Sequence, residues 1–341
     1  MKRWLLGGLL IGCAAFSMVK TTPFPLRYPA SFGNRISVPD DNPTTIEGVE
    51  LGRYLFYDTL LSKNNTISCS SCHHQNKAFT DGFALSVGVS GRPTLRNAMS
   101  LANLLWVRDF FWDGHASSLE AQALVPMAHP DEMGLPPEKA AEKLNRTTFY
   151  PEKFRKAFGT ESITPVLIAR ALAQFERTLI SADSRYDRFL SGKETLSAAE
   201  KRGLAVFEGS KGNCTHCHGG AKFFQNVFHN NGLDASPLDP GRQEVTTQEA
   251  DFARFRVPTL RNIAVTGPYM HDGRFKTLEE VVAHYSDHVH ASRTLSPELS
   301  KPIHLSTLEK QDLVAFLRIL TDSTFLTNPA FSNPFVQGRR Y

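Results

Sequence analysis

Two short stretches, "TISCSSCHH" (Thr66–His74) and "NCTHCHG" (Asn213–Gly219), share one arrangement of cysteine and histidine. In each stretch two cysteines are separated by two residues, and a histidine directly follows the second cysteine. The 341-residue chain has five cysteines, and all but Cys13 belong to these two units. The repeated C-x-x-C-H unit is therefore the feature that organises the chain.

The C-x-x-C-H pattern is typical of c-type haem attachment, in which both thiols bind vinyl groups of one haem and the histidine ligates its iron. A structural zinc site usually pairs two C-x-x-C units much closer together, and a disulfide needs no adjacent histidine. A thioredoxin-like redox pair occurs in a βαβ context, which this sequence does not show. The predicted attachment and proximal-ligand residues are Cys69, Cys72 and His73 for the first haem and Cys214, Cys217 and His218 for the second.

The sequence around the two units repeats as well, which indicates an internal duplication. Each half reads as a helix, a haem loop, a further loop and a closing amphipathic helix. We expect an all-α fold of two cytochrome c-like haem domains. The corresponding segments are "GRYLF" (52–56) and "GLAVF" (203–207), "PTLRN" (93–97 and 258–262), "WDGHASSLE" (112–120) and "HDGRFKTLE" (271–279), and "LAQFERTL" (172–179) and "LVAFLRIL" (313–320).

The N-terminus resembles an export signal, because Lys2 and Arg3 precede an apolar run too short to span a membrane. "LIGC" (10–13) resembles a lipobox and predicts a lipid anchor at Cys13, with a plain signal peptide as the alternative. We therefore expect an exported, periplasmic protein. The predicted organisation is a leader over 1–20, a tether over 21–43, an N-terminal haem domain over 44–192, a C-terminal haem domain over 193–325 and a tail over 326–341.

Charge gives no sign of a nucleic-acid partner. The chain has 38 basic and 34 acidic residues, a formal net charge of +4. Three of the basic residues lie in the leader, and the remainder form no Lys/Arg stripe of the kind that binds nucleic acid.

The halves differ where iron chemistry would be decided. Aligning them on Asp113 and Asp272 places Pro126 opposite Tyr285. A tyrosine can ligate iron and a proline cannot, so we expect a closed second haem and an open first haem that admits peroxide. Other side chains that could ligate the second haem are Met270, His284 and His288.

Gln122 and Glu132 flank Pro126. A carboxylate beside an open haem can accept a proton from peroxide and return it to the departing oxygen. Gln122 could orient the substrate or a water molecule. From these residues alone, a solvated turn at 129–132 remains the alternative interpretation of Glu132.

The motifs together resemble the bacterial dihaem cytochrome c peroxidases and their relative that matures tryptophan tryptophylquinone in methylamine dehydrogenase. The resemblance covers roughly 48–321 and depends on "FWDG" with "LEAQAL" in the first half and "VPTLRN" with "TGPYMHDG" in the second. It implies a peroxidatic haem ligated by His73 and an electron-transfer haem ligated by His218 and Tyr285. It further implies Gln122 and Glu132 as distal residues beside Pro126, Trp112 as an electron relay between the haems, and a calcium ion held by Asn97, Thr266 and Pro268.

Three positions depart from the family pattern. Val89 stands where many of the peroxidases have a second histidine that closes the peroxidatic iron, so we expect a site that is open without activation. Tyr285 replaces the usual methionine, and an anionic oxygen ligand lowers the haem potential. His115 replaces the usual arginine after "WDG", and the sequence offers no explanation.

The sequence thus predicts a dihaem peroxidase that reduces hydrogen peroxide to water with electrons from a small redox protein, taken in through the second haem. One alternative is an enzyme that oxidises side chains of a partner protein through a high-valent iron state. A second alternative is a non-enzymatic dihaem electron carrier. The resemblance also makes a homodimer an expectation.

Overall fold

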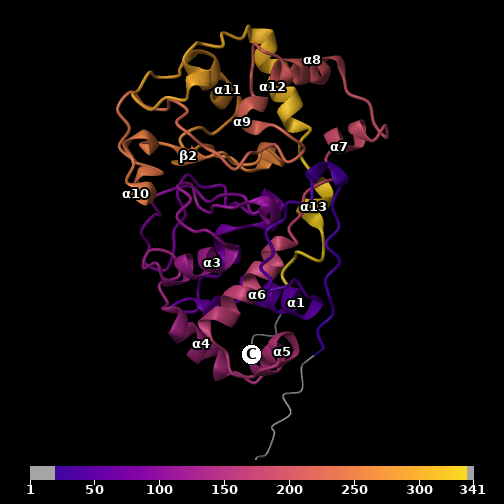
Figure 1. Ribbon diagram of the computed structural model, residues 1–341, viewed down its shortest axis with the longest axis vertical. Coiled ribbons are helices and arrows are strands. Elements are labelled where there is room, and N and C mark those ends of the chain that lie inside the picture. The colour runs from indigo at the N-terminus through magenta and orange to yellow at the C-terminus, as the bar shows by residue number, and fades with distance from the viewer. Residues whose placement is uncertain (1–19, 336–341) are drawn as a thin grey trace, which may run out of the picture.

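The computed structural model describes residues 20–335, so the predicted leader with Cys13 and the last six residues lie outside the described part. The chain folds into two mostly helical lobes that are stacked along the long axis of the molecule (Figure 1). No helix within residues 20–335 is long and apolar enough to cross a membrane.

The N-terminal lobe contains the first six helices. They are α1 (Ile46–Tyr57), α2 (Cys69–Cys72), α3 (Leu119–Ala128), α4 (Pro137–Asn145), α5 (Phe149–Phe158) and α6 (Pro165–Arg177). The later helices are α7 (Arg185–Leu190), α8 (Ala198–Glu208), α9 (Thr215–His218), α10 (Gln243–Thr246), α11 (Leu278–Asp287), α12 (Thr307–Arg318) and α13 (Ser323–Thr327). The described strands, β1 (Phe228–His229) and β2 (Phe255–Arg256), form one antiparallel pair. Short 3₁₀ turns lie at Ala30–Phe32, Thr59–Leu61, Gln75–Lys77, Leu104–Trp106, Glu249–Asp251, Ile263–Val265 and Pro297–Leu299.

All four helices predicted from the repeated segments are present, as α1, α6, α8 and α12. Each begins where the sequence supplies a helix-capping residue. Thr45 and Thr164 accept hydrogen bonds from backbone N–H groups of the first turns of α1 and α6. Ser197 and Ser306 form capping boxes, each with a glutamate three positions later, at the starts of α8 and α12.

Each lobe is built on a close crossing of two helices at a glycine. A Cβ atom added to Gly52 of α1 would lie 1.9 Å from the Ala171 carbonyl oxygen of α6. In the other lobe, a Cβ atom on Gly203 of α8 would lie 1.9 Å from the Asp312 carbonyl oxygen of α12. The same backbone-to-backbone approach therefore occurs in both lobes, at the glycines of the two corresponding sequence segments.

Two hydrophobic cores accompany these crossings. The larger core surrounds α1, α3 and α6 and contains Phe56, Phe79 and Phe175, while the smaller core surrounds α8, α11 and α12 and contains Phe207 and Phe316. The repeated segments supply Phe56 and Phe175 to the larger core and Phe207 and Phe316 to the smaller one. The predicted all-α architecture is thus confirmed in its helical character, with the small β1–β2 sheet as an addition, and the duplication and domain limits stay predictions.

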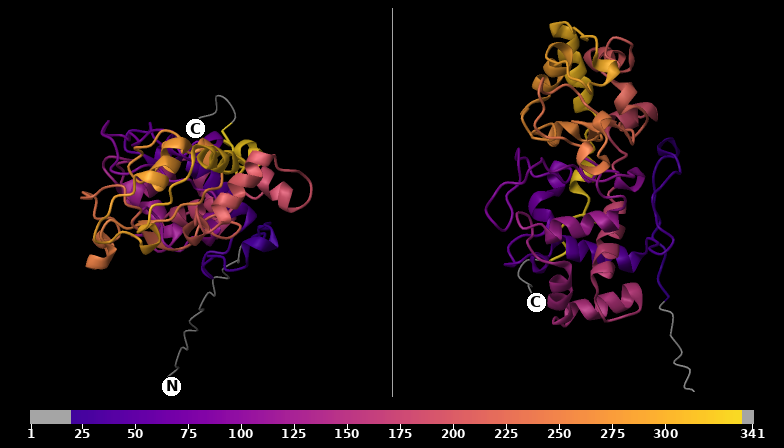
Figure 2. Two further views of the ribbon diagram at one scale, coloured as in Figure 1. Left: turned by 90° about the horizontal axis from the view of Figure 1, so that it is seen from above. Right: turned by 60° about the vertical axis from the view of Figure 1, so that its left-hand side comes forward.

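Both ends of the described chain pack against the N-terminal lobe (Figure 2). Phe32, in the segment predicted to be a tether, is 2% exposed and belongs to the larger core. After α12 the chain returns to the same core, where Phe325 and Phe331 are buried. Gln75 holds this return by donating hydrogen bonds to the carbonyl oxygens of Phe325 and Asn328. These aromatic side chains attach both terminal segments to the folded body.

We expect Gly203→Ala to lower the free energy of unfolding by roughly 3 kcal/mol, because a methyl group at this crossing must push α8 away from α12. Urea unfolding followed by circular dichroism measures the effect. The control is Ala205→Gly, on the exposed side of the same helix, for which helix propensity alone predicts a loss of about 1 kcal/mol. Equal losses for the two variants would show that the helices do not depend on this close approach.

Candidate functional site

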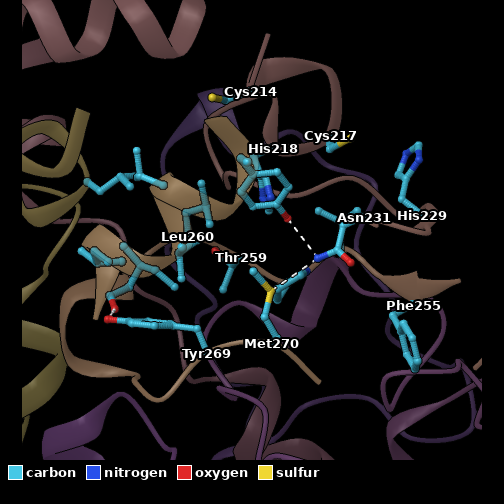
Figure 3. A pocket seen from close by; sticks show the side chains of 18 of the residues that line it. Cys214, Cys217, His218, His229, Asn231, Phe255, Thr259, Leu260, Tyr269 and Met270 are labelled. Atoms are coloured by element: carbon cyan, nitrogen blue, oxygen red, sulfur yellow. Dashed lines mark hydrogen bonds between the residues drawn. The ribbon is translucent and has the colours of Figure 1, made fainter. Parts of the chain in front are cut away.

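The structure has one cavity around each C-x-x-C-H unit. The N-terminal cavity, of about 860 Å³, is lined by Cys69, Cys72 and His73 together with side chains of α3 and α6. The C-terminal cavity, of about 240 Å³, is lined by Cys214, Cys217 and His218 together with side chains of α11 and α12. Figure 3 shows Cys214, Cys217 and His218 at one end of the C-terminal cavity. Each lobe therefore places its whole cysteine–histidine unit on the surface of a cavity.

The four cysteines of the two units are free thiols in the structure. Within residues 20–335, no cluster of three or more His, Cys, Asp or Glu side chains is arranged to hold a metal ion. Two thiols and an imidazole facing a largely apolar cavity are the residues that a covalently attached haem requires, and the site fits that group.

The histidine of each C-x-x-C-H unit is oriented by a backbone carbonyl. His73 Nδ1 lies 2.6 Å from the Phe79 oxygen, and His218 Nδ1 lies 3.3 Å from the Phe223 oxygen. A carbonyl oxygen only accepts hydrogen bonds, so Nδ1 carries the proton and Nε2 is left as the metal-binding atom. Burial lowers the pKa of both imidazoles, that of His218 to about 4, which favours the neutral form that ligates iron.

The two carbonyls are presented by the same local backbone. Phe79 and Phe223 both adopt left-handed conformations, with φ of 62° and 55°. Their side chains are buried in the cores of their lobes. Core packing of a phenylalanine thus holds each carbonyl toward the histidine, a relation that neither motif reveals by itself.

The residues predicted to lie beside the first haem are brought together in the N-terminal cavity. Gln122 and Pro126 come from α3, and Glu132 comes from the turn that follows it; all three line the cavity with His73. The Glu132 side chain is 33% exposed, so it is not simply solvated as the alternative interpretation supposed. Burial raises the pKa of the Glu132 carboxyl above its usual value, while the nearby His129 partly opposes that shift.

Sequence reasoning missed His129 as a neighbour of Glu132. His129 also lines the N-terminal cavity, and its Nδ1 lies 3.9 Å from Glu132 Oε1. The signal was available, because a histidine three positions before a glutamate in a tight turn lies near it. His129 is therefore a polar neighbour of the partly exposed Glu132 carboxyl.

A second residue missed in the sequence is Glu176 of α6, which lines the same cavity. It is 5% exposed, and its Oε2 atom is buried without a hydrogen-bond partner among the described residues. Burial raises the pKa of Glu176 to about 8, although the neighbouring Arg177 acts in the opposite direction. The sequence marked this residue only as part of an amphipathic helix.

The structure also shows the contacts of two residues that depart from the family pattern, Val89 and His115. Val89 does not line the N-terminal cavity, and its backbone N–H donates to the Glu132 carbonyl oxygen with an N···O distance of 2.8 Å. His115 does line it, stacked on Phe111 with its Nδ1 2.6 Å from an Asp113 oxygen. Asp113 thus gives His115 the carboxylate partner that the sequence could not identify.

In the C-terminal cavity two of the candidate ligands converge on one amide. Tyr285 and Met270 both line the cavity, whereas His284 and His288 do not. Asn231 Nδ2 lies 3.3 Å from the Tyr285 hydroxyl oxygen and 3.4 Å from the Met270 sulfur, and Figure 3 shows Asn231 and Met270 facing each other. Burial raises the pKa of Tyr285 to about 12. The geometry narrows the candidate ligands to Tyr285 and Met270.

The two cavities share a wall. Trp112 is part of this wall; its Nε1 donates to the Asn97 carbonyl oxygen at 2.9 Å, and its ring lies edge-on to His271. Its position between the cavities agrees with the relay expected from the resemblance. The residues that line both cavities, called the shared wall below, are Asn97, Ala98, Met99, Ser100, Trp112 and Arg256.

The three residues expected at a calcium ion lie around the C-terminal cavity. Asn97, Thr266 and Pro268 all line it. The Asn97 side-chain amide donates hydrogen bonds to the carbonyl oxygens of Phe83 and Ala84. Hence the three residues share a region of the structure, and calcium binding there stays a prediction.

Comparison with known proteins places the chain in a family. Residues 46–195 match the family model described as "Di-haem cytochrome c peroxidase". Methylamine utilization protein MauG of Methylorubrum extorquens is 40% identical over 286 residues, which covers 83% of this chain and 80% of that protein. The chain belongs to the di-haem cytochrome c peroxidase family. Its members include enzymes named as oxidoreductases of this class, and membership implies two haem groups.

Further relatives agree with this assignment. Cytochrome c551 peroxidase of Nitrosomonas europaea is 37% identical over 284 residues, covering 82% of this chain and 81% of that protein. A crystal structure of a MauG-like protein associated with microbial copper homeostasis matches with a TM-score of 0.85 and 38% identity, over 91% of this chain and 99% of that chain. The similarity therefore extends over both cavities.

We expect the pH dependence of stability to identify Glu176. Its pKa is raised on folding, so the protein loses free energy of unfolding as pH rises from about 4.5 to about 8, by a few kcal/mol in all. Glu176→Gln stays neutral and should lack this loss. Urea midpoints of the haem-loaded protein at pH 5 and pH 8.5 measure it, with Glu138→Gln, an exposed change on α4, as the control. An identical pH dependence in Glu176→Gln and the unmodified protein would contradict the expectation.

Proposed function

We propose that the protein is a c-type dihaem peroxidase that reduces hydrogen peroxide to water with electrons from an external donor. The observation that carries this proposal is the contrast between two corresponding helices. Pro126 and Tyr285 occupy the same position counted from the first residues of α3 and α11. Pro126, which cannot ligate iron, lines the N-terminal cavity, and Tyr285, which can, lines the C-terminal cavity.

Haem bound at the two cavities would supply the redox chemistry, held by the two cysteine pairs with His73 and His218 as proximal ligands. The chain's own part in the N-terminal cavity is to position peroxide and to move its protons. Glu132 accepts a proton from one peroxide oxygen and delivers it to the other oxygen as that atom leaves as water. Gln122 orients the peroxide by hydrogen bonding from α3. Two electrons and two further protons complete the conversion of one peroxide to two waters.

The electrons enter, in this proposal, at the C-terminal cavity, from a small redox protein such as a cytochrome c. Trp112 in the shared wall lies between the two cavities and is the side chain placed to relay them. Tyr285 would be a further side chain holding the iron of the second haem. The relatives named as cytochrome c peroxidases support a cytochrome c as the electron donor.

Several accompanying features belong to the same proposal. The protein is exported to the periplasm, where it is either free or attached through a lipid on Cys13. A calcium ion is held near Asn97, Thr266 and Pro268, since oxygen donors suit calcium. Two copies of the chain form a dimer.

A second candidate function is oxidation of side chains on a partner protein. Tyr285 favours it, because the dihaem peroxidases usually have methionine at this position, and two relatives named MauG are 40% and 35% identical to the chain. The carrier alternative has less support, because an electron carrier gains nothing from Glu132 in a haem cavity and the relatives are named as enzymes.

We expect Glu132→Gln to lower peroxide turnover by roughly 10²- to 10⁴-fold while leaving haem content unchanged, because the amide cannot accept the proton. Turnover is followed by oxidation of a reduced cytochrome c or a small-molecule donor. The carboxylate is the active form and burial raises its pKa, so turnover of the unmodified protein should fall with decreasing pH at a value above 4.5, and this limb should vanish in the variant.

Glu142→Gln, an exposed change that removes a partner of Lys139 on α4, is the matched control and should keep full turnover. If Glu132→Gln turns over peroxide as fast as this control, Glu132 has no acid–base role. The unmodified protein could instead react with one equivalent of peroxide and then show no further turnover, whichever soluble donor is added. That result would favour oxidation of a partner protein.

We expect Tyr285→Met to raise the midpoint potential of one haem by a substantial part of the roughly 0.8 V range that axial ligands span, because a thioether favours ferrous iron and an anionic oxygen favours ferric iron. Tyr285→Phe should convert that haem from low spin to high spin. Redox titration and electron paramagnetic resonance measure the two effects. Spectra and potentials unchanged in both variants would remove Tyr285 from its proposed role as a ligand of this haem.

A further inference from the structure

One buried arginine in the shared wall lacks a carboxylate partner. Three arginines of the described chain are 5% exposed or less: Arg177, Arg256 and Arg261. Arg177 pairs with Glu120, and Arg261 pairs with both oxygens of Asp187. Among residues 20–335, no acidic side chain forms an ion pair with Arg256. Arg256 therefore differs from the other two buried arginines in having no carboxylate partner.

The contacts that Arg256 does make are weak for a cation. Its Nε donates to the Phe111 carbonyl oxygen at 3.3 Å, and its Nη2 lies 3.3 Å from the Met99 sulfur. Nη1 has no acceptor among the described residues. Burial lowers the pKa of Arg256 to about 10, with Asp109 acting in the opposite direction. A buried guanidinium without a hydrogen-bonded anion is costly, so a missing anion is indicated.

Three nearby carboxylates are already engaged, and a fourth, Asp109, forms no hydrogen bond or ion pair with Arg256. Asp113, Asp239 and Glu244 line the N-terminal cavity, and all three pair with Arg96. None of them is thus free to neutralise Arg256. An anion that meets this guanidinium must come from inside one of the cavities, because Arg256 lines both of them.

The position of Arg256 is fixed by the sheet and by the relay tryptophan. It lies on β2, paired with Phe228 of β1, and its backbone N–H donates to the Trp112 carbonyl oxygen at 2.7 Å. Trp112 and Arg256 are thus held together in the wall between the cavities. The side chain has little freedom to turn to solvent, so its charge stays in that wall.

We propose that Arg256 binds a propionate carboxylate of a haem in one of the two cavities and sets the reduction potential of that haem. This inference rests on the haem occupancy proposed above. Each haem has two propionates, which are anionic at neutral pH, and a guanidinium binds a carboxylate with paired hydrogen bonds. A fixed positive charge beside a haem favours the ferrous state, because reduction removes one positive charge from the iron.

The test compares Arg256→Gln with Arg256→Lys and the unmodified protein. Haem content is measured first, so that a chain without two haems counts against the occupancy and not against Arg256. In Arg256→Gln, the ferrous-to-ferric ratio of one haem at a fixed applied potential should fall at least tenfold, equivalent to a 59 mV drop in its midpoint. Arg256→Lys keeps the charge and should restore most of that ratio. The haem whose midpoint moves is the one that supplies the propionate.

Arg293→Gln is the matched control, since it removes the same formal charge from an exposed arginine paired with Glu249, and it should leave both midpoints unchanged. If Arg256→Gln holds two haems and neither midpoint moves beyond that of the control, the inference is wrong. If Arg256→Gln does not load haem, Arg256→Lys carries the test alone. Its propionate bending bands in resonance Raman spectra should shift from those of the unmodified protein, and unchanged bands would overturn the proposal. None of these measurements depends on peroxide turnover. A protein inactive toward peroxide can therefore still confirm or refute the proposed role of Arg256.

Discussion

Both cavities depend on a hydrogen bond between a histidine ring and a backbone carbonyl. The Nδ1 atoms of His73 and His218 face the carbonyl oxygens of Phe79 and Phe223, which leaves each Nε2 as the atom available to iron. The phenylalanine that presents each carbonyl is buried in the core of its lobe. The same phenylalanine therefore packs in the core and orients the histidine. A substitution that shifts this phenylalanine would also shift the histidine.

The two cavities share this histidine–carbonyl hydrogen bond but differ in the other side chains that line them. A polar set with Gln122 and Glu132 lines the N-terminal cavity, whereas Asn231 brings the Tyr285 hydroxyl and the Met270 sulfur together in the C-terminal cavity. The shared wall joins these unlike sites, and Arg256 contributes a fixed charge there. Burial raises the pKa values of Glu132 and Glu176 and so favours the neutral forms of these two carboxyls.

Much of the site was predictable because its chemistry is encoded over short distances along the chain. The spacing of Cys69, Cys72 and His73 places three functional groups within one turn of helix, so the motif alone indicates the cofactor. Helix positions were predictable as well, since capping residues and apolar periodicity are local signals. His129 and Glu176 were missed because their importance comes from what faces them, and the sequence does not record which residues a cavity brings together.

The sequence by itself determined the helices of the corresponding segments, the two C-x-x-C-H units and the difference between Pro126 and Tyr285, because these follow from residue type and spacing. Only the tertiary structure decided that His284 and His288 do not line the C-terminal cavity, that His115 meets Asp113, and that Arg256 is buried between the cavities without a carboxylate. The physical reason is that burial and pairing depend on segments distant in the chain. The free-energy cost of burying a charged side chain depends on whether a distant segment supplies its partner. The local sequence does not specify that segment.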